Sequence, residues 1–104
     1  MRVLAIALGG CLRAPPVPYG MTEDTGGHIA YILGAMAALA RDPRVTRADI
    51  ATRLFDEPAL GRIHAATRES IGPKSEIVRI DSGDRRYLAK EDLARDRDAF
   101  TRAL

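Results

Sequence analysis

The sequence predicts an α/β protein, a partial Rossmann-like layer in which about three parallel strands are flanked by helices. Short apolar runs and helical patterns alternate along the chain in the order strand, helix, strand, short helix, strand, helix. The length of 104 residues suits a single small domain. The composition, 46% hydrophobic and 29% charged, is ordinary for a globular chain. Alternation of this kind favours a parallel sheet joined by right-handed crossovers.

The first strand is expected over residues 3–8, a continuous apolar run that ends at two glycines. Such runs are typical of a fully buried parallel strand. The run also resembles a lipoprotein signal before Cys11, but it is shorter than the apolar core of a secretory signal. The segment from Cys11 to Thr25 is expected to be an irregular loop, because it contains several residues that interrupt helices and strands: Pro15, Pro16, Pro18 and Gly20.

The first helix is expected to begin at Thr25 or Asp24, either of which can cap it, and to end near Arg41. Its apolar residues recur near helical spacing: Ile29, Ile32, Leu33, Met36, Ala37, Leu39 and Ala40. Asp42-Pro43 ends the helix, because proline cannot continue it. A second strand is expected over residues 45–52.

Residues 55–70 show no single period, and Pro58 is a candidate start for a short helix. That helix would carry Leu60, Ile63 and Ala66. His64 lies in the same stretch and is expected at the surface, and residues 71–73 are expected to end the helix. A third strand follows over residues 75–80, then a turn at residues 82–84 and a final helix over residues 90–104.

Charge and composition exclude several classes of protein. The net charge of +2, the scarcity of aromatic residues and the lack of a basic run argue against nucleic-acid binding. No apolar run has the length of a membrane span. The single cysteine, Cys11, rules out an internal disulfide and suits a reducing, cytoplasmic compartment. Cys11 and the two histidines lack metal-site spacing, so neither a metal nor another cofactor is expected.

The glycine pair Gly26-Gly27, at the start of the first helix, is the strongest candidate for a ligand site. The first N–H groups of a helix have no internal partner, and the helix dipole favours negative charge there. Glycine lets a ligand approach the backbone closely. With His28 in the first turn, these residues predict a site for a phosphate-bearing or hydroxyl-rich small molecule. Glu23 and Asp24 are interpreted as capping carboxylates, not as acid–base catalysts.

Several blocks in order resemble retaining GT-B glycosyltransferases, and among them the sucrose-phosphate synthases and sucrose synthases. The family opens its first helix with Asp-Thr-Gly-Gly-Gln, which stands here as Asp24 to His28. The similarity spans nearly the whole chain, and its further blocks are Ala51-Thr52-Arg53, Arg79-Ile80, Gly83, Arg86-Tyr87-Leu88 and Lys90-Glu91-Asp92-Leu93. The chain differs in having His28 for the family's glutamine and Gly9 for a histidine of the sucrose-type enzymes, which puts the acceptor sugar in doubt.

The resemblance implies that residues 1–104 form one partial acceptor-side domain of a two-domain enzyme, a fragment inactive by itself. Such enzymes move a glycosyl unit from a nucleotide sugar to a sugar or sugar phosphate with retention. Gly26, Gly27 and His28 would then contact the acceptor, and Arg86 would hold its phosphate. From the residues alone, Arg85 and Arg86 fit either a phosphate site or a solvated turn.

Two alternative functions come from other classes. A non-catalytic α/β module would bind a ligand or a partner, and a thin sheet of this size would form a homodimer or swap elements to cover its edges. A dinucleotide-binding dehydrogenase is disfavoured, because no Gly-x-Gly-x-x-Gly follows the first strand.

Overall fold

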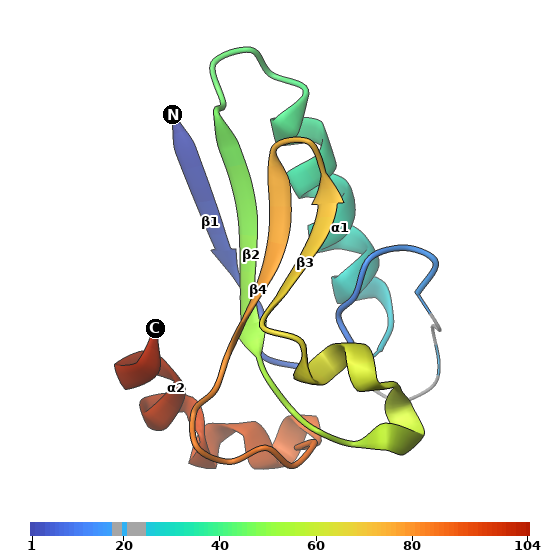
Figure 1. The fold of residues 1–104 in the computed structure, drawn as a ribbon, viewed down its shortest axis with the longest axis vertical. Helices are drawn as coiled ribbons and strands as arrows, with labels where there is room; N and C mark the ends of the chain where they lie inside the picture. Colours follow the sequence, from blue (N-terminus) through green and yellow to red (C-terminus); the bar gives the residue numbers. More distant parts are fainter. Residues whose placement is uncertain (18–19, 21–24) are drawn as a thin grey trace.

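A computed structural model describes residues 1–17, 20 and 25–104, and it confirms the α/β class (Figure 1). The strands and helices are β1 (Arg2–Ile6), α1 (Gly27–Ala40), β2 (Arg47–Arg53), β3 (Arg68–Gly72), β4 (Ser75–Ile80) and α2 (Arg97–Ala103). Short 3-10 turns occupy Pro58–Leu60, Arg62–Ala65 and Lys90–Arg95. None of the helices in the described residues has the length and apolar character that a membrane crossing requires.

The sheet has four strands in the order β1-β2-β4-β3, one more than the sequence predicts. The three expected strands are parallel: β1 pairs with β2, and β2 pairs with β4. The additional strand, β3, is antiparallel to β4 and forms a hairpin with it. The prediction that residues 71–73 only end a helix was wrong, because Ile71 and Gly72 belong to this strand. Pairing with β4 supplies backbone hydrogen bonds that local sequence cannot reveal.

The expected short helix after Pro58 is replaced by two separate 3-10 turns. Gly61 lies between them with φ +108°, a left-handed conformation that interrupts the helix and favours glycine. Ala66 is extended and lies outside the turns. His64, expected at the surface, is buried with 1% of its surface exposed.

The strand β1 is not buried on both faces, as its apolar run predicts. Val3 and Ala5 pack against the core below α1, whereas Leu4 and Ile6 are 55% and 52% exposed. Successive strand residues point to opposite faces, so Leu4 and Ile6 lie on the face away from α1. β1 is also an edge strand, paired only with β2. A fully buried parallel strand needs covered faces, and here only one face of β1 is covered.

The main core lies between α1 and the sheet. Ile29, Leu33 and Met36 of α1 contact Ile50 of β2 and Ile77 of β4 in one buried cluster. Burial of this apolar stripe holds α1 against the sheet. The helix begins at Gly27 with Gly26 as its N-cap, and it has no side-chain cap.

Thr25 does not cap α1, in contrast to the prediction. Its hydroxyl is buried and accepts a hydrogen bond from the Cys11 N–H at 2.9 Å. Asp24, the other candidate cap, lies outside the described residues. Thr25 therefore ties the start of α1 to the loop that follows β1.

The expected final helix is divided into the 3-10 turn Lys90–Arg95 and the short helix α2. The division falls at Asp96, whose carboxylate is buried and accepts hydrogen bonds from Arg53 and Ser82. This pairing positions Asp96 against the sheet, which a continuous surface helix would not require.

Candidate functional site

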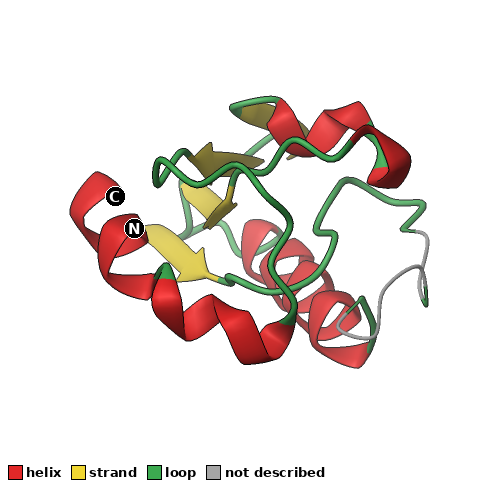
Figure 2. Ribbon diagram, turned by 90° about the horizontal axis from the view of Figure 1, so that it is seen from below, coloured by secondary structure: helices red, strands yellow, loops and turns green. Residues whose placement is uncertain are grey.

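The predicted site lies at the carboxyl end of the sheet, where the three parallel strands terminate. The loop after β1, the start of α1 and the loop after β4 all reach this end (Figures 1 and 2). Figure 2 looks directly onto it from below. In open parallel α/β sheets, ligands bind outside the carboxyl ends of the strands. The fold therefore brings the glycine pair and the Arg86 loop to the end where ligands are expected.

The glycine pair leaves open space in front of the helix. A Cβ added to Gly26 or Gly27 would have no atom within 4 Å. Among the described residues, no side chain caps the first turn of α1 or occupies its N–H groups. This end of α1 can accept an anion or a hydroxyl oxygen against its backbone.

His28 lies in the same first turn and is exposed. Its Nε2 lies 3.4 Å from the Gly9 carbonyl oxygen, so the ring donates a long hydrogen bond to the residue three places after β1. A contact of that length is weak, and the imidazole keeps its Nδ1 available for a ligand.

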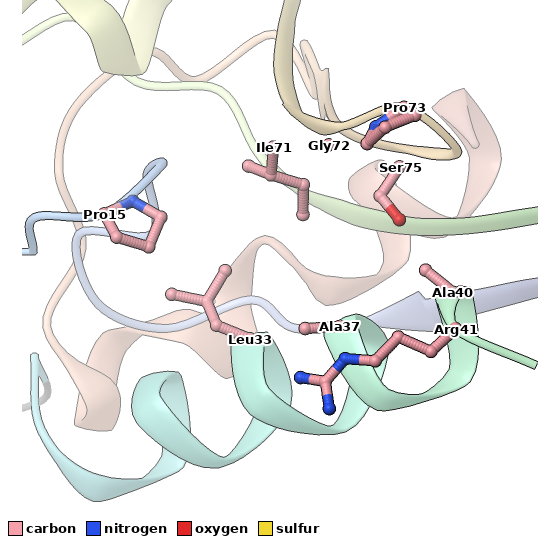
Figure 3. Close-up of a pocket in the computed structure, with 9 residues that line it drawn as sticks. All are labelled: Pro15, Leu33, Ala37, Ala40, Arg41, Ile71, Gly72, Pro73 and Ser75. Atoms are coloured by element: carbon pink, nitrogen blue, oxygen red, sulfur yellow. The ribbon is translucent and has the colours of Figure 1, made fainter.

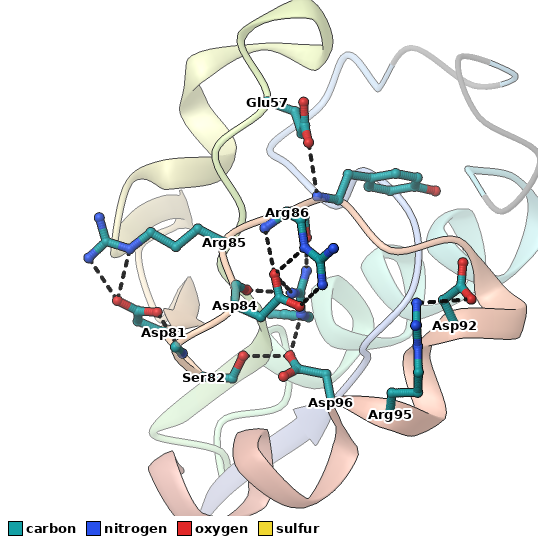
Figure 4. A network of polar contacts seen from close by, with 12 residues as sticks. Glu57, Asp81, Ser82, Asp84, Arg85, Arg86, Asp92, Arg95 and Asp96 are labelled. Atoms are coloured by element: carbon teal, nitrogen blue, oxygen red, sulfur yellow. Dashed lines mark hydrogen bonds and ion pairs between the residues drawn. The ribbon is translucent and has the colours of Figure 1, made fainter.

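Arg86 is exposed and is held by Asp84. The guanidinium donates to both carboxylate oxygens of Asp84, at 3.0 and 2.8 Å (Figure 4). These hydrogen bonds hold the pKa of Asp84 well below its usual range, and its backbone bond from Arg86 acts in the same direction. Arg86 makes no hydrogen bond or ion pair with Gly26, Gly27 or His28 in the described chain.

Arg85 forms a similar pair with Asp81, at 2.8 and 3.1 Å. The hydrogen bonds from Arg85 lower the pKa of Asp81. Arg85 and Arg86 are thus neighbours with nearly equal exposure, 65% and 72%, and each has one aspartate partner. Arg85 is the natural control for any role of Arg86.

Arg53, the last residue of β2, holds the Arg86 loop from inside the protein. Its side chain is 1% exposed and forms ion pairs with Asp96 and Asp84. It also donates to the backbone carbonyls of Arg86 and Asp84. Because all these partners belong to the segment after β4, Arg53 sets the path of that loop. Sequence reasoning missed this role, although Arg53 belongs to one of the blocks that resemble the family.

Arg79, near the end of β4, has the corresponding role on the other side of the sheet. It is buried and pairs with Glu69 of β3 at 2.7 Å. Its guanidinium also donates to the Leu12 carbonyl at 2.9 Å. Two buried arginines therefore connect the strand ends to the loops of the candidate site.

His64 lies in the 3-10 turn Arg62–Ala65, and its side chain is buried. Its ring stacks on Phe55, with centroids 4.7 Å apart. Nδ1 lies 2.9 Å from the Gly61 carbonyl oxygen, which can only accept, so Nδ1 carries the proton. Nε2 is buried and has no hydrogen-bond partner among the described residues. Burial lowers the pKa of His64 below its usual 6.5, and the nearby charges of Arg79 and Arg13 lower it further, against the Gly61 hydrogen bond and Glu69.

Acidification is expected to destabilise the protein through His64. The pKa is lower in the folded state, so the unfolded chain binds the proton first as pH falls below 6.5. Stability is full above that pH and decreases towards the folded pKa, by at most about 1.4 kcal/mol per pH unit for one proton. Urea unfolding between pH 7.5 and 5 measures this slope.

The His64→Phe variant provides the comparison, because it keeps an aromatic ring on Phe55 and cannot titrate. Its stability is expected to change much less between pH 6.5 and 5. Asp81 and Asp84 interfere little, because the stability that their lowered pKa values contribute is lost only as the pH approaches their unfolded-state pKa of 3.8. Equal slopes for the two proteins would contradict the role of His64.

No group of three or more metal-ligating side chains lies together in the part of the chain that the structure describes. No family model matches the chain.

Curated relatives are similar over most of the chain, and their names agree. A probable sucrose-phosphate synthase of Beta vulgaris is 29% identical over 109 residues and matches 88% of this chain. A probable sucrose-phosphate synthase 1 of Oryza sativa subsp. indica is 32% identical over 104 residues, again 88% of this chain. Sucrose-phosphate synthase 4 of Arabidopsis thaliana is 29% identical over 100 residues. The chain spans about a tenth of the length of each of these relatives.

Proposed function

The chain is related to a segment of sucrose-phosphate synthases, and on that premise we propose that it forms part of the acceptor-side domain of a GT-B glycosyltransferase. The enzyme would move a glycosyl unit from a nucleotide sugar to a sugar or sugar phosphate. A cytoplasmic location is part of the proposal and agrees with the presence of only one cysteine, Cys11, in the sequence. The observation that carries it is the open, uncapped glycine pair at the carboxyl end of the sheet.

The acceptor is proposed to lie against the start of α1. Gly26 and Gly27 would let a sugar hydroxyl approach the backbone N–H groups, and His28 would offer one further hydrogen bond. Arg86 would exchange the Asp84 carboxylate for the acceptor phosphate, two of whose oxygens can accept the same pair of N–H hydrogen bonds. The ion pair is exposed, so this exchange costs little free energy.

Catalysis is not proposed for the 104-residue chain alone. A glycosyl transfer also needs a site for the nucleotide sugar, and the relatives are about ten times longer than the aligned segment. We propose that this segment supplies acceptor contacts and that other residues bind the donor.

Fructose 6-phosphate is the acceptor probe for this proposal, with UDP-glucose as the donor probe. Isothermal titration is expected to detect fructose 6-phosphate binding that Arg86→Ala weakens about tenfold or more, because a hydrogen-bonded charge pair is lost. Gly27→Val is expected to weaken binding as well, because its side chain enters the open space at the start of α1.

Arg85→Ala is the matched control and is expected to leave fructose 6-phosphate binding unchanged. An equal loss for Arg85→Ala and Arg86→Ala would show only a general charge effect, and would contradict the assigned role of Arg86. A folded chain that binds neither probe would contradict the proposed acceptor site.

A non-catalytic module that associates with another chain is the second candidate. The observation that favours it is the exposure of Leu4 and Ile6 on the edge strand β1. Edge strands of native proteins are usually protected by charge, proline or a covering element, and residues 3–6 of β1 carry no charge and no proline. A sedimentation coefficient that increases with protein concentration would support this candidate if Leu4→Lys abolishes the increase. A monomer at all concentrations would count against it.

A further inference from the structure

A concave surface lies away from the carboxyl end of the sheet. It is a groove of about 360 Å³ between the C-terminal half of α1 and the β3–β4 hairpin (Figure 3). The groove is lined by Pro15, Leu33, Ala37, Ala40, Arg41, Ile71, Gly72, Pro73 and Ser75. Ser75 is the first residue of β4 and Arg41 directly follows α1, so both lie toward the amino ends of the parallel strands. The proposed acceptor site does not use these residues.

The walls of the groove are mainly apolar. Leu33, Ala37 and Ala40 form the wall that α1 contributes, and Ile71 faces them from β3 (Figure 3). Pro15 closes one end. An apolar body of a small molecule can therefore lie along α1, and the volume is in the range of small-molecule sites, about 300–1,000 Å³.

The other end of the groove is polar, with the exposed side chain of Arg41 and the buried hydroxyl of Ser75. Ser75 is 5% exposed, and its Oγ is buried without a hydrogen bond to any described residue. Arg41 makes no side-chain hydrogen bond or ion pair within the described chain, whereas nearby Arg44 pairs with Asp42 at 2.7 Å. Buried polar groups are normally satisfied, so the Ser75 hydroxyl is suited to a ligand atom.

The charge of this end favours an anion. The guanidinium of Arg41 donates only, and the Ser75 hydroxyl can donate to the same acceptor. Asp42, the nearest acidic residue along the chain, is occupied by Arg44. The C-terminal end of α1 contributes about half a negative charge, which is less than the full positive charge of Arg41.

We propose that this groove binds a small carboxylic acid with an apolar body. The carboxylate lies at the end of the groove that Arg41 and Ser75 line, and the apolar body lies between Leu33 and Ile71. The proposal is independent of the acceptor site, because none of the groove residues belongs to it.

Octanoate is the probe, and a titration followed by amide NMR shifts is the measurement. Octanoate is expected to shift the amides of residues 37–41 and 71–75 in a saturable way. Arg41→Gln is expected to weaken binding about threefold to fivefold, as for a partly exposed ion pair. Ser75→Ala is expected to weaken it about threefold, as for one lost hydrogen bond. Ala37→Phe, on the exposed side of α1, is expected to fill the groove and abolish binding.

Arg102→Gln is the matched control, since it removes an exposed arginine that does not line the groove, and it is expected to leave binding unchanged. Octylammonium and 1-octanol have the same apolar chain and are expected to bind more weakly than octanoate. Equal binding of all three probes, or equal effects of Arg41→Gln and Arg102→Gln, would overturn the carboxylate site. The absence of saturable shifts in the groove would overturn the proposal altogether.

Discussion

Replacing Arg53 with methionine is expected to remove a large part of the stability of the fold. The methionine keeps the apolar bulk of the side chain but leaves Asp96, 8% exposed, as a buried carboxylate without its cation. Breaking a buried ion pair in this way costs about 3–5 kcal/mol, against about 5–15 kcal/mol for the total stability of a domain. Urea unfolding monitored by circular dichroism measures the loss.

Two further variants separate the ion pair from general effects of charge. Arg85→Met removes an exposed arginine from the same loop and is expected to leave the unfolding midpoint nearly unchanged. The double variant Arg53→Met/Asp96→Leu is expected to recover part of the loss, because no unpaired charge remains buried. If Arg53→Met were no less stable than Arg85→Met, the network around Arg53 would not be the support of this loop.

The second large loss of stability is expected when Arg79 is replaced. Arg79→Met removes the partner of Glu69, which is 15% exposed, and leaves the Leu12 carbonyl without its donor. The free energy of unfolding is expected to decrease by about 3–5 kcal/mol, as for other broken buried pairs. Arg68→Met is the control, because Arg68 pairs with Glu76 but is 70% exposed.

The Arg79 variant also has a local readout. Leu12 precedes Arg13 in the loop after β1, and the neighbouring Cys11 N–H is bonded to buried Thr25 at the start of α1. Exchange of the Cys11 amide hydrogen is therefore expected to accelerate more in Arg79→Met than the global loss of stability explains. Exchange that follows global stability alone would show that Arg79 does not order the loop beside the glycine pair.

Together these contacts describe how the sheet supports the candidate site. Arg53 connects β2 to the loop that carries Arg86, and Arg79 connects β4 to the loop that leads to the glycine pair. Each arginine lies at or near the end of a strand, and its side chain contacts a segment that is far away in the sequence. The positions of the proposed acceptor contacts thus depend on two side chains that do not belong to the site itself.

Local sequence patterns were enough to predict the bounds of several helices and strands to within about two residues. The third predicted strand, residues 75–80, coincides with β4, and the first helix was placed within about two residues of α1. β2 begins two residues later than predicted and ends one residue later. These elements could be predicted because their apolar residues repeat with the period of a strand or a helix, and because glycine and proline mark their ends.

The candidate site was predictable only in part. The glycine pair could be assigned to a helix start from the sequence, and the structure places it there with open space in front. The ion pair between Arg86 and Asp84 was not predicted, because from the sequence alone Arg85 and Arg86 fit either a phosphate site or a solvated turn. The supports of the site were not predictable, since Arg53 and Arg79 look like surface residues in a sequence pattern.

The sequence by itself determined the α/β class, the bounds of α1 and β4, and the position of the glycine pair. Only the tertiary structure decided that β3 is a strand, that Leu4 and Ile6 are exposed, and that His64, Arg53 and Arg79 are buried. The physical reason is the range of the interactions. Helical and strand periods involve near neighbours, whereas Arg53 meets Asp96 43 residues away and Arg79 meets Leu12 67 residues away. A charged side chain becomes buried only where folding brings such a partner to it.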